Sequence, residues 1–362
     1  GIQQRVEILK ALRTGADVLI LDEPTAVLTP QETDELFAVI RRVVRELGMT
    51  VIIITHKLYE VMAISDRVGV MRKGRLIGVE NTCDVDEKKL ASMMVGRPVL
   101  YDRLEKTGEA GAEQIRVSGL TVCDDRGLVA VDGLSLSVRA GEVLGIAGFL
   151  GSGRSALARA LFGIDPLLTG SITLNQAKLS LRSPNDAVRH GIGYISDASA
   201  DELLCKNLPI AQNITMANIR GIQGPYHLDL RLEQEVCRAF REKLVIQTAE
   251  DDEQVQHLSR GNQQKVLLSK WIFTSCQILM IDEPCRNIDQ CGKVEIYNII
   301  NKLVLEGKSV ILISSNFEEL LGMSDRILVM QEGTIVRRLE RSAFSINAII
   351  DALSAPAARK PI

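Results

Sequence analysis

Four short apolar segments, each rich in branched residues, stand out from an otherwise mixed chain. In order, they cover residues 17–22, 50–55, 277–282 and 309–314. An amphipathic helical pattern lies between the members of each pair, at 31–47 and at 291–306. Strands that are apolar on both faces and alternate with helices are typical of a parallel sheet covered by helices. The pattern therefore predicts an α/β fold with a parallel-sheet core.

The segments after each pair of strands also match one another. A helical pattern at 57–64 and at 316–322 is followed by a strand that ends in a turn, at 73–74 and at 332–333. Between the two pairs, the sequence from Ile115 alternates between apolar and polar residues, as half-exposed antiparallel strands do. We therefore expect an antiparallel β-subdomain beside the second pair.

These matches belong to a long internal repeat. The region from Gly1 to Gly74 is repeated from Gly261 to Gly333, and both copies carry Asp-Glu-Pro at the end of an apolar strand. A repeat of this length is a domain rather than a short motif. Residues 114–260 precede the second copy and have no counterpart ahead of the first. We therefore expect tandem domains, the first incomplete, in a chain truncated at its N-terminus.

The expected domain boundaries follow from the repeat and from a change in composition. Residues 1–95 form the C-terminal part of the first domain, and residues 114–345 form the second. Residues 96–113 lose periodicity and gain Gly and charge, which is typical of a linker. The end of a C-terminal helix and a tail account for residues 346–362.

Composition and charge narrow the function. A net charge of −3 and 4% aromatic residues give no reason to expect nucleic-acid binding. No apolar run reaches the ~18 residues that a membrane-spanning helix needs. If the protein acts at a membrane, we expect it to bind there through a partner protein. The seven cysteines show no metal-ligand spacing, and we interpret them as reduced, mostly buried thiols of a cytoplasmic protein.

A glycine-rich segment between a predicted strand and a predicted helix carries the first candidate chemistry. Residues 148–155 fit the phosphate-loop pattern GxxxxGK[ST], with Arg in the Lys position. Glycines let successive backbone N–H groups turn toward an anion, and the helix N-terminus adds partial positive charge. The cation would contact phosphate oxygens, and the final hydroxyl would bind Mg²⁺. The candidate nucleotide-binding residues here are Gly148, Gly151, Ser152, Gly153, Arg154 and Ser155.

Two acidic pairs end the apolar strands in equivalent places. Asp282 and Glu283 end one strand, and Asp22 and Glu23 repeat them in the first copy. An Asp at the carboxyl end of a strand can hold Mg²⁺, and a neighbouring Glu can polarise an attacking water. We therefore predict Asp282 and Asp22, with Ser155, as metal ligands, and Glu283 and Glu23 as catalytic residues.

The peptide Leu258-Ser-Arg-Gly-Asn-Gln-Gln resembles the LSGGQ signature of the ATP-binding cassette (ABC) ATPases. Phosphate loop, signature and Asp-Glu strand come in the order and spacing of that family, and the resemblance covers nearly the whole chain. It implies a helical signature subdomain. It also implies that Ser259, Gly261 and Asn262 contact the γ-phosphate of a nucleotide held by the opposite domain.

The resemblance further implies paired ATPase domains that use ATP and Mg²⁺. His56 stands in the place of the family's switch histidine, so it is a predicted catalytic residue, whereas the second copy has Ser315 there. A hydroxyl cannot carry the positive charge of His to the γ-phosphate, so the second domain's own site is expected to be the weaker. Residues 1–8 resemble the end of the first domain's signature. The phosphate loop of that first domain is missing from the sequence. The chain alone is therefore expected to bind nucleotide weakly and to turn it over slowly.

Within the family, the chain is most similar to the tandem ATPases of bacterial sugar importers of the ribose, galactose and xylose type. The pointers are residues 21–32, Gly-Arg-Ser in the phosphate loop, and Ser-Ser at 314–315. The resemblance implies a peripheral protein on the cytoplasmic face of the inner membrane. Transmembrane permease subunits would be its partners, a periplasmic or lipoprotein solute-binding protein would act indirectly, and no nucleic acid is implied.

Three alternatives stay open. Residues 1–8 look like those of nucleoside-type importers, so a nucleoside could be the solute. The departures at Arg154, Arg260 and Ser315 would suit a catalytically degenerate, regulatory nucleotide-binding module. The third is a soluble ABC ATPase that acts on ribosomes or DNA. Residues 96–113 are shorter than the charged helical linker of ribosome-acting relatives, and the sequence lacks the zinc-binding Cys pairs of DNA-repair relatives.

Overall fold

The computed structural model divides the chain into two compact units. The first contains Gly1–Val99 with Asp289–Cys291, and the second contains Leu100–Ile288 with Gly292–Ile362. The structure describes residues 17–25, 30–55, 57–72, 74–95, 111–124, 126–149, 151–198, 200–224, 226–248, 253–286 and 288–354. Each unit is considered by itself.

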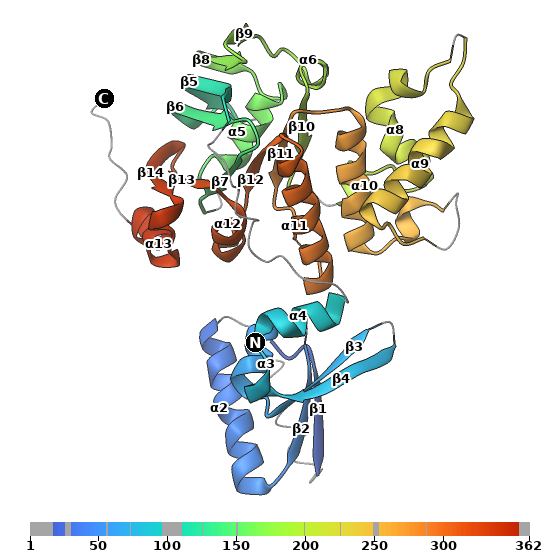
Figure 1. Ribbon diagram of the computed structural model, residues 1–362. Helices are drawn as coiled ribbons and strands as arrows, with labels where there is room; N and C mark the ends of the chain where they lie inside the picture. Colours follow the sequence, from blue (N-terminus) through green and yellow to red (C-terminus); the bar gives the residue numbers. More distant parts are fainter. Residues whose placement is uncertain are drawn as a thin grey trace. The chain divides into compact units, whose positions relative to one another are not determined.

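The first unit contains two small sheets and three helices within its described residues (Figure 1). Strands β1 (Val18–Asp22) and β2 (Thr50–Ile54) pair in parallel and are connected through α2 (Pro30–Leu47). Strands β3 (Arg67–Arg72) and β4 (Arg75–Asn81) form an antiparallel hairpin. The remaining elements are α3 (Leu58–Ile64), a 3₁₀ turn (Thr82–Asp84) and α4 (Glu87–Val95).

The second unit is built on a six-stranded mixed sheet with the strand order β10-β11-β12-β7-β13-β14. All neighbours in this sheet are parallel except β13 and β14, which are antiparallel. The strands are β7 (Val143–Ala147), β10 (Ile192–Ile195), β11 (Ile278–Asp282), β12 (Ser309–Ile313), β13 (Arg326–Gln331) and β14 (Thr334–Glu340). A second, antiparallel sheet has the order β6-β5-β8-β9, with β5 (Glu113–Cys123), β6 (Val129–Arg139), β8 (Leu167–Leu174) and β9 (Ala177–Leu179).

Helices cover the six-stranded sheet and extend from it as a separate helical group, α8 to α10 (Figure 1). The α-helices of the second unit are α5 (Arg154–Leu161), α6 (Pro184–Arg189), α7 (Ala200–Leu203), α8 (Ile210–Thr215), α9 (Leu230–Leu244), α10 (Arg260–Phe273), α11 (Gln290–Leu305), α12 (Phe317–Met323) and α13 (Ile346–Ser354). Short 3₁₀ segments lie at Met216–Ile222, Val255–His257 and Arg341–Ala343.

The central strand β7 shows why these strands are continuously apolar. Its residues Val143 and Ala147 belong to the core on one face of the sheet, with side chains of α10, α11 and α12. Its residues Leu144 and Ile146 belong to the core on the other face, with α5 and the antiparallel sheet. A strand with cores on both faces has no position at which a polar residue is favoured.

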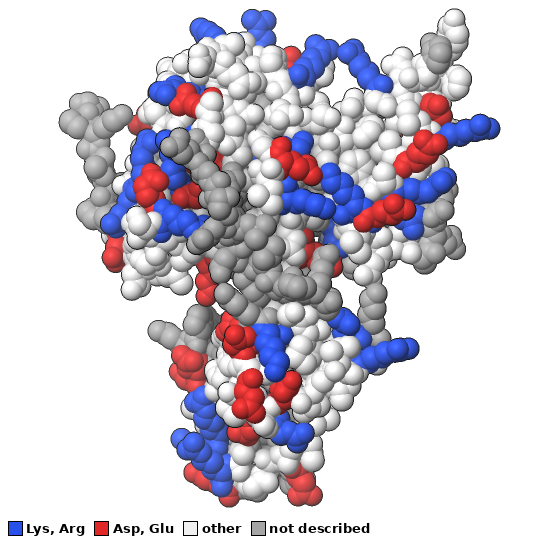
Figure 2. All heavy atoms as spheres, viewed as in Figure 1, with Lys and Arg blue, Asp and Glu red and all other residues white. Residues whose placement is uncertain are grey.

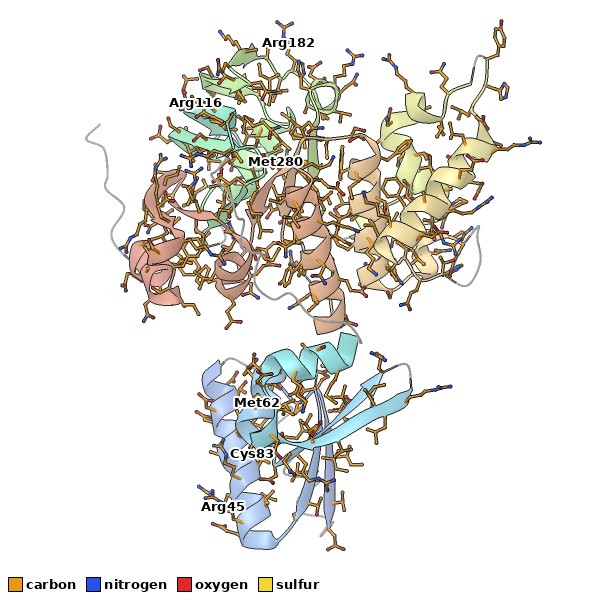
Figure 3. The ribbon with its side chains drawn as sticks, in the orientation of Figure 1. Arg45, Met62, Cys83, Arg116, Arg182 and Met280 are labelled. Carbon is orange, nitrogen blue, oxygen red and sulfur yellow. The ribbon has the colours of Figure 1, made fainter. Side chains whose placement is uncertain are left out.

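The repeated strands differ sharply in burial between the two units. The register of β1 with β2, Val18 opposite Thr50, recurs in β11 and β12 as Ile278 opposite Ser309. Met280 (labelled in Figure 3) is 1% exposed, whereas its counterpart in the repeat, Ile20, is 62% exposed. In the second unit β7 pairs with both β12 and β13. Within the described first unit, no strand joins β2 to β3. Val18, Ile20 and Ile52 are exposed, so one face of the β1–β2 sheet is uncovered.

The predicted strands and helices are confirmed, with small shifts at their ends. The helix after the glycine-rich segment begins at Arg154 rather than at Ala156, because Gly153 already serves as its N-cap. The predicted linker, 96–113, overlaps β5, which begins at Glu113, and its residues 96–110 lie outside the described part. The predicted segment 346–362 contains the whole of α13 rather than the end of a helix, and residues 355–362 are not described.

The hydropathy of the helices, the distribution of charged side chains and the exposure of the cysteines can be compared with the sequence predictions. No helix in the described part of the chain is long and apolar enough to cross a membrane. Acidic and basic side chains are interspersed over the face shown in Figure 2. The prediction of mostly buried cysteines was wrong for Cys83 and Cys205, which are exposed within the 3₁₀ turn Thr82–Asp84 and after α7.

Candidate functional site

The glycine-rich segment connects the buried strand β7 to helix α5, as predicted. Gly151 and Gly153 have positive φ angles of 83° and 93°. A Cβ on Gly153 would lie 2.2 Å from the carbonyl oxygen of Ala130 on β6. The backbone can therefore turn here only because residue 153 has no side chain.

Replacing Gly153 by Ala should lower the free energy of unfolding by about 2 kcal/mol or more, because left-handed strain adds to a backbone clash. Gly307→Ala is the matched control, since Gly307 has a φ of 89° but open space around its Cβ position. Denaturant unfolding of both variants would separate the two contributions. Equal losses would contradict the close packing of β6 against residue 153.

Ser155, the first-turn hydroxyl of α5, reaches the end of β11. Its Oγ donates a hydrogen bond to Asp282 Oδ2 at 2.6 Å. Burial raises the pKa of Asp282 to about 7, and the nearby charges of Asp197 and Glu283 act in the same direction, while Ser155 and Arg154 oppose them. The two predicted metal ligands of the second copy are therefore adjacent, and a neighbouring cation would favour the ionised carboxylate.

Glu283 lies next to this pair, in a left-handed backbone conformation with φ of 52°. Its backbone N–H donates to Ile313 O at 2.8 Å, which joins the ends of β11 and β12. Its carboxylate oxygen Oε1 accepts a hydrogen bond from the backbone N–H of Ser315 at 2.7 Å. The same oxygen lies 3.7 Å from Arg154 Nη2. The structure therefore brings together Arg154, Glu283 and the switch position.

Two buried donors in this segment have no hydrogen-bond acceptor among the described residues. They are Nη1 of Arg154 and Oγ of Ser152. Buried polar groups in folded proteins are nearly always satisfied, and an anion in a glycine-rich turn at a helix start would supply acceptors for both. The residues present fit a phosphate group.

The predicted signature residues lie at the start of α10. Ser259 is the N-cap, and its Oγ accepts a hydrogen bond from the backbone N–H of Asn262 at 3.4 Å. The Asn262 amide donates to Gln247 O at 3.1 Å. Gly261 follows in the first turn, where a Cβ would make only ordinary contacts. Within the described second unit, no hydrogen bond joins these residues to the phosphate loop, so their predicted role toward an opposite domain stays a prediction.

The first-copy candidates are only partly within the described residues. Asp22 is exposed at the end of β1, unlike its buried counterpart Asp282. Glu23 repeats the geometry of Glu283, with φ of 45° and an N–H that donates to Ile54 O at 2.8 Å. His56 and residues 1–8 lie outside the described part.

Each copy also contains a buried glutamate, on the helix that follows the second strand of its pair, that was not predicted from the sequence. Glu319 of α12 accepts a hydrogen bond from Ser314 Oγ at 2.5 Å, and burial raises its pKa. In the first unit, Glu60 of α3 accepts hydrogen bonds from Thr25 Oγ1 and Thr55 Oγ1 at 2.5 and 3.0 Å. The sequence did carry a signal, because Glu60 and Glu319 occupy equivalent positions of the internal repeat.

The fold and the site together define a nucleotide-binding protein of the phosphate-loop class. A glycine-rich turn leads from a buried parallel strand into a helix, and its hydroxyl meets the acidic end of the next strand but one in the sheet. The crystal structure of an ATP-binding cassette of an ABC transporter in its ADP conformation has the same fold. It matches with a TM-score of 0.57 and 21% identity, over 67% of this chain and 96% of that chain.

Sequence comparison places the chain in a family. Residues 131–286 match the ABC transporter family model. The ribose import ATP-binding protein RbsA 3 of Rubrobacter xylanophilus is 44% identical over 96% of this chain and 69% of its own length. A putative ribose/galactose/methyl galactoside import ATP-binding protein of Burkholderia cenocepacia is 41% identical over 96% of this chain and 67% of its own length. The chain belongs to the ABC transporter family of ATP-binding proteins.

Proposed function

We propose that the protein is the ATP-binding and ATP-hydrolysing subunit of a bacterial ABC importer for simple sugars. The observation that carries the proposal is the meeting of Arg154, Ser155, Asp282 and Glu283 at the carboxyl end of the central sheet. The relatives' names refer to ribose and galactose, which favours the sugar branch over the nucleoside alternative.

In the proposed site, the phosphate loop and Arg154 hold the nucleotide phosphates. Ser155 and Asp282 would hold Mg²⁺, which neutralises developing charge when it is bound. Glu283 orients and polarises water beside the terminal phosphate. In the first copy, the proposed metal ligand is Asp22. Glu23 would polarise the attacking water, and His56 would contact the γ-phosphate.

The second copy's site is the weaker one in this proposal. Ser315 donates a backbone N–H to Glu283 but has no cationic side chain. Arg154 has a planar guanidinium where the phosphate-loop pattern has the compact ammonium of Lys. These two features are also what favours a regulatory nucleotide-binding role for the second unit within an active parent ATPase. Fast ATP hydrolysis by the purified chain that is abolished in Glu283→Gln would contradict a weakened site.

The first unit is proposed to be the C-terminal part of the first of two tandem ABC ATPase domains. The support is the uncovered face of its β1–β2 sheet, whose exposed residues Val18, Ile20 and Ile52 align with buried residues of the second unit. A strand, phosphate loop and helix like residues 143–161 would cover that face. In the complete arrangement, paired domains would drive a transmembrane permease from the cytoplasmic face of the inner membrane, with a solute-binding protein acting indirectly.

The nucleotide site is tested by titrating the chain with Mg-ATP in a calorimeter. We expect saturable binding that becomes about tenfold to a hundredfold weaker in Arg154→Ala, the cost of one charged contact to phosphate. Arg159→Ala is the matched control, because Arg159 lies on the same helix and pairs with Asp165 at 2.7 Å. An absence of binding, or an equal loss in both variants, would contradict the site.

A further inference from the structure

The two terminal nitrogens of the Arg154 guanidinium have different surroundings. Its Nη2 lies 3.7 Å from Glu283 Oε1, and the two side chains are only 9% and 16% exposed. Its Nη1 is buried and has no hydrogen-bond partner among the described residues. One nitrogen of the fork therefore faces the catalytic carboxylate, while the other remains available to an acceptor.

Glu283 is also held by contacts with backbone groups. Its Oε1 accepts from the Ser315 N–H at 2.7 Å, and its own N–H donates to Ile313 O at 2.8 Å. These backbone contacts belong to the ends of β11 and β12 and do not depend on a ligand. The contact with Arg154 is different, because Arg154 begins the helix that follows the phosphate loop.

A phosphate group would compete with Glu283 for the same cation. Arg presents several donors in a planar fork, and it attracts carboxylate and phosphate oxygens alike. In a site that excludes most water, a cation shared with an internal carboxylate offers less attraction to an incoming anion than a free one.

We infer that Arg154 is a positioning residue for Glu283 as well as a phosphate ligand. In the nucleotide-free site Glu283 is its counter-ion, and a nucleotide phosphate draws the guanidinium away and releases the carboxylate. The inference rests on the proposed function, because it requires that the second copy's phosphate loop binds nucleotide. Its consequence is that Glu283 reduces the affinity for nucleotide, and does so through Arg154.

A double-mutant cycle on the full chain tests this coupling. The affinity for Mg-AMP-PNP, which removes hydrolysis from the measurement, is determined for the unmodified chain, Glu283→Gln, Arg154→Ala and the double variant. Glu283→Gln should bind about fivefold more tightly, the effect of a partly buried ion pair of about 1 kcal/mol. In the Arg154→Ala background the same substitution should change nothing. Glu235→Gln, on the exposed face of α9, controls for the change in net charge.

Each other outcome of the cycle overturns a defined part of this account. Tightening that persists in the Arg154→Ala background would mean that Glu283 repels phosphate directly, and the inference would be wrong. No tightening in the otherwise unmodified chain would also overturn it. If no variant binds nucleotide, the proposed function itself fails, and the inference fails with it.

A second measurement needs no binding by the Arg154→Ala variant. In ¹⁵N-arginine-labelled protein, the side-chain resonance of Arg154 is identified by its loss in Arg154→Lys. It should shift in Glu283→Gln without nucleotide, and shift in the unmodified chain when Mg-AMP-PNP is added. A resonance that is unmoved by Glu283→Gln would show that the ion pair does not form in solution.

Discussion

Replacing Lys265 by Ala should lower the free energy of unfolding of the second unit by about 3–5 kcal/mol, as expected when one partner of a buried ion pair is removed. Lys265 lies on α10 and is 1% exposed. Its Nζ donates to Val245 O at 2.9 Å and pairs with Glu295 Oε2 at 2.5 Å. The substitution would remove both contacts and leave a cavity along the path of the side chain.

The matched control is Lys270→Ala on the same helix. Lys270 Nζ donates to Leu203 O at 3.1 Å, and no salt bridge is found for it in the described part of the chain. The loss should therefore be about 1–2 kcal/mol, the value of one hydrogen bond and partial burial. Urea unfolding curves of the two variants supply the comparison. A loss for Lys265→Ala no larger than that for Lys270→Ala would contradict an essential ion pair.

The pair also connects two parts of the proposed ATPase. Helix α10 begins with the signature peptide at Ser259, and Glu295 lies on α11, which follows the Asp282-Glu283 strand end. The internal repeat places Arg5 and Glu35 at the equivalent positions of the first copy, although Arg5 lies outside the described residues. The sequence of both copies thus carries a cation and an acid at these equivalent positions.

Much of the fold could be predicted because its physical causes are local. The central strands are apolar on both faces, and their helices carry an amphipathic period, so both appear directly in the sequence. The phosphate loop was predictable for a related reason. A turn at Gly151 and Gly153 needs positive φ angles, and the pattern of glycines before Arg154 and Ser155 reports that requirement.

The remaining features depend on contacts between distant segments. The Arg154–Glu283 pair joins the start of α5 to the end of β11, and no local pattern encodes its 3.7 Å separation. The role of Ser315 was predicted from its side chain, yet its contact with Glu283 is made by the backbone N–H. Asp22 and Asp282 look alike in sequence, but only Asp282 is buried, because the described part of the first unit has no counterpart of β7 and α5.

The two buried glutamates of the repeat should respond in opposite ways to the same substitution. Glu60 lies 3.1 Å from Lys57 Nζ, whereas the residue equivalent to Lys57 in the second unit is Asn316, which caps α12 instead. Burial alone would raise the pKa of Glu60, but hydrogen bonds from Thr25, Lys57 and Thr55 outweigh it and lower that pKa. Among the described residues, no cation forms a salt bridge with Glu319, and burial raises its pKa.

These opposite shifts fix the sign of the pH dependence. A lowered pKa means that the ionised Glu60 stabilises the fold above its usual pKa of 4.5, and that this stability is lost as pH falls through the lower folded value. A raised pKa means that Glu319 favours the folded state as the neutral acid, and that this advantage declines as pH rises above the same usual value.

Glutamine has the shape of the neutral acid and cannot ionise, so it separates the two cases. Glu60→Gln should destabilise the first unit by about 1–2 kcal/mol at neutral pH, with the difference disappearing in acid. Glu319→Gln should leave the second unit unchanged or more stable at neutral pH, because it removes the cost of ionising a buried carboxyl. Calorimetric unfolding from acid to neutral pH measures both, and hydrogen exchange in α3 and α12 assigns each change to its unit. Equal destabilisation by both substitutions would mean that both carboxyl groups are charged, and that Lys57 does not distinguish the two copies.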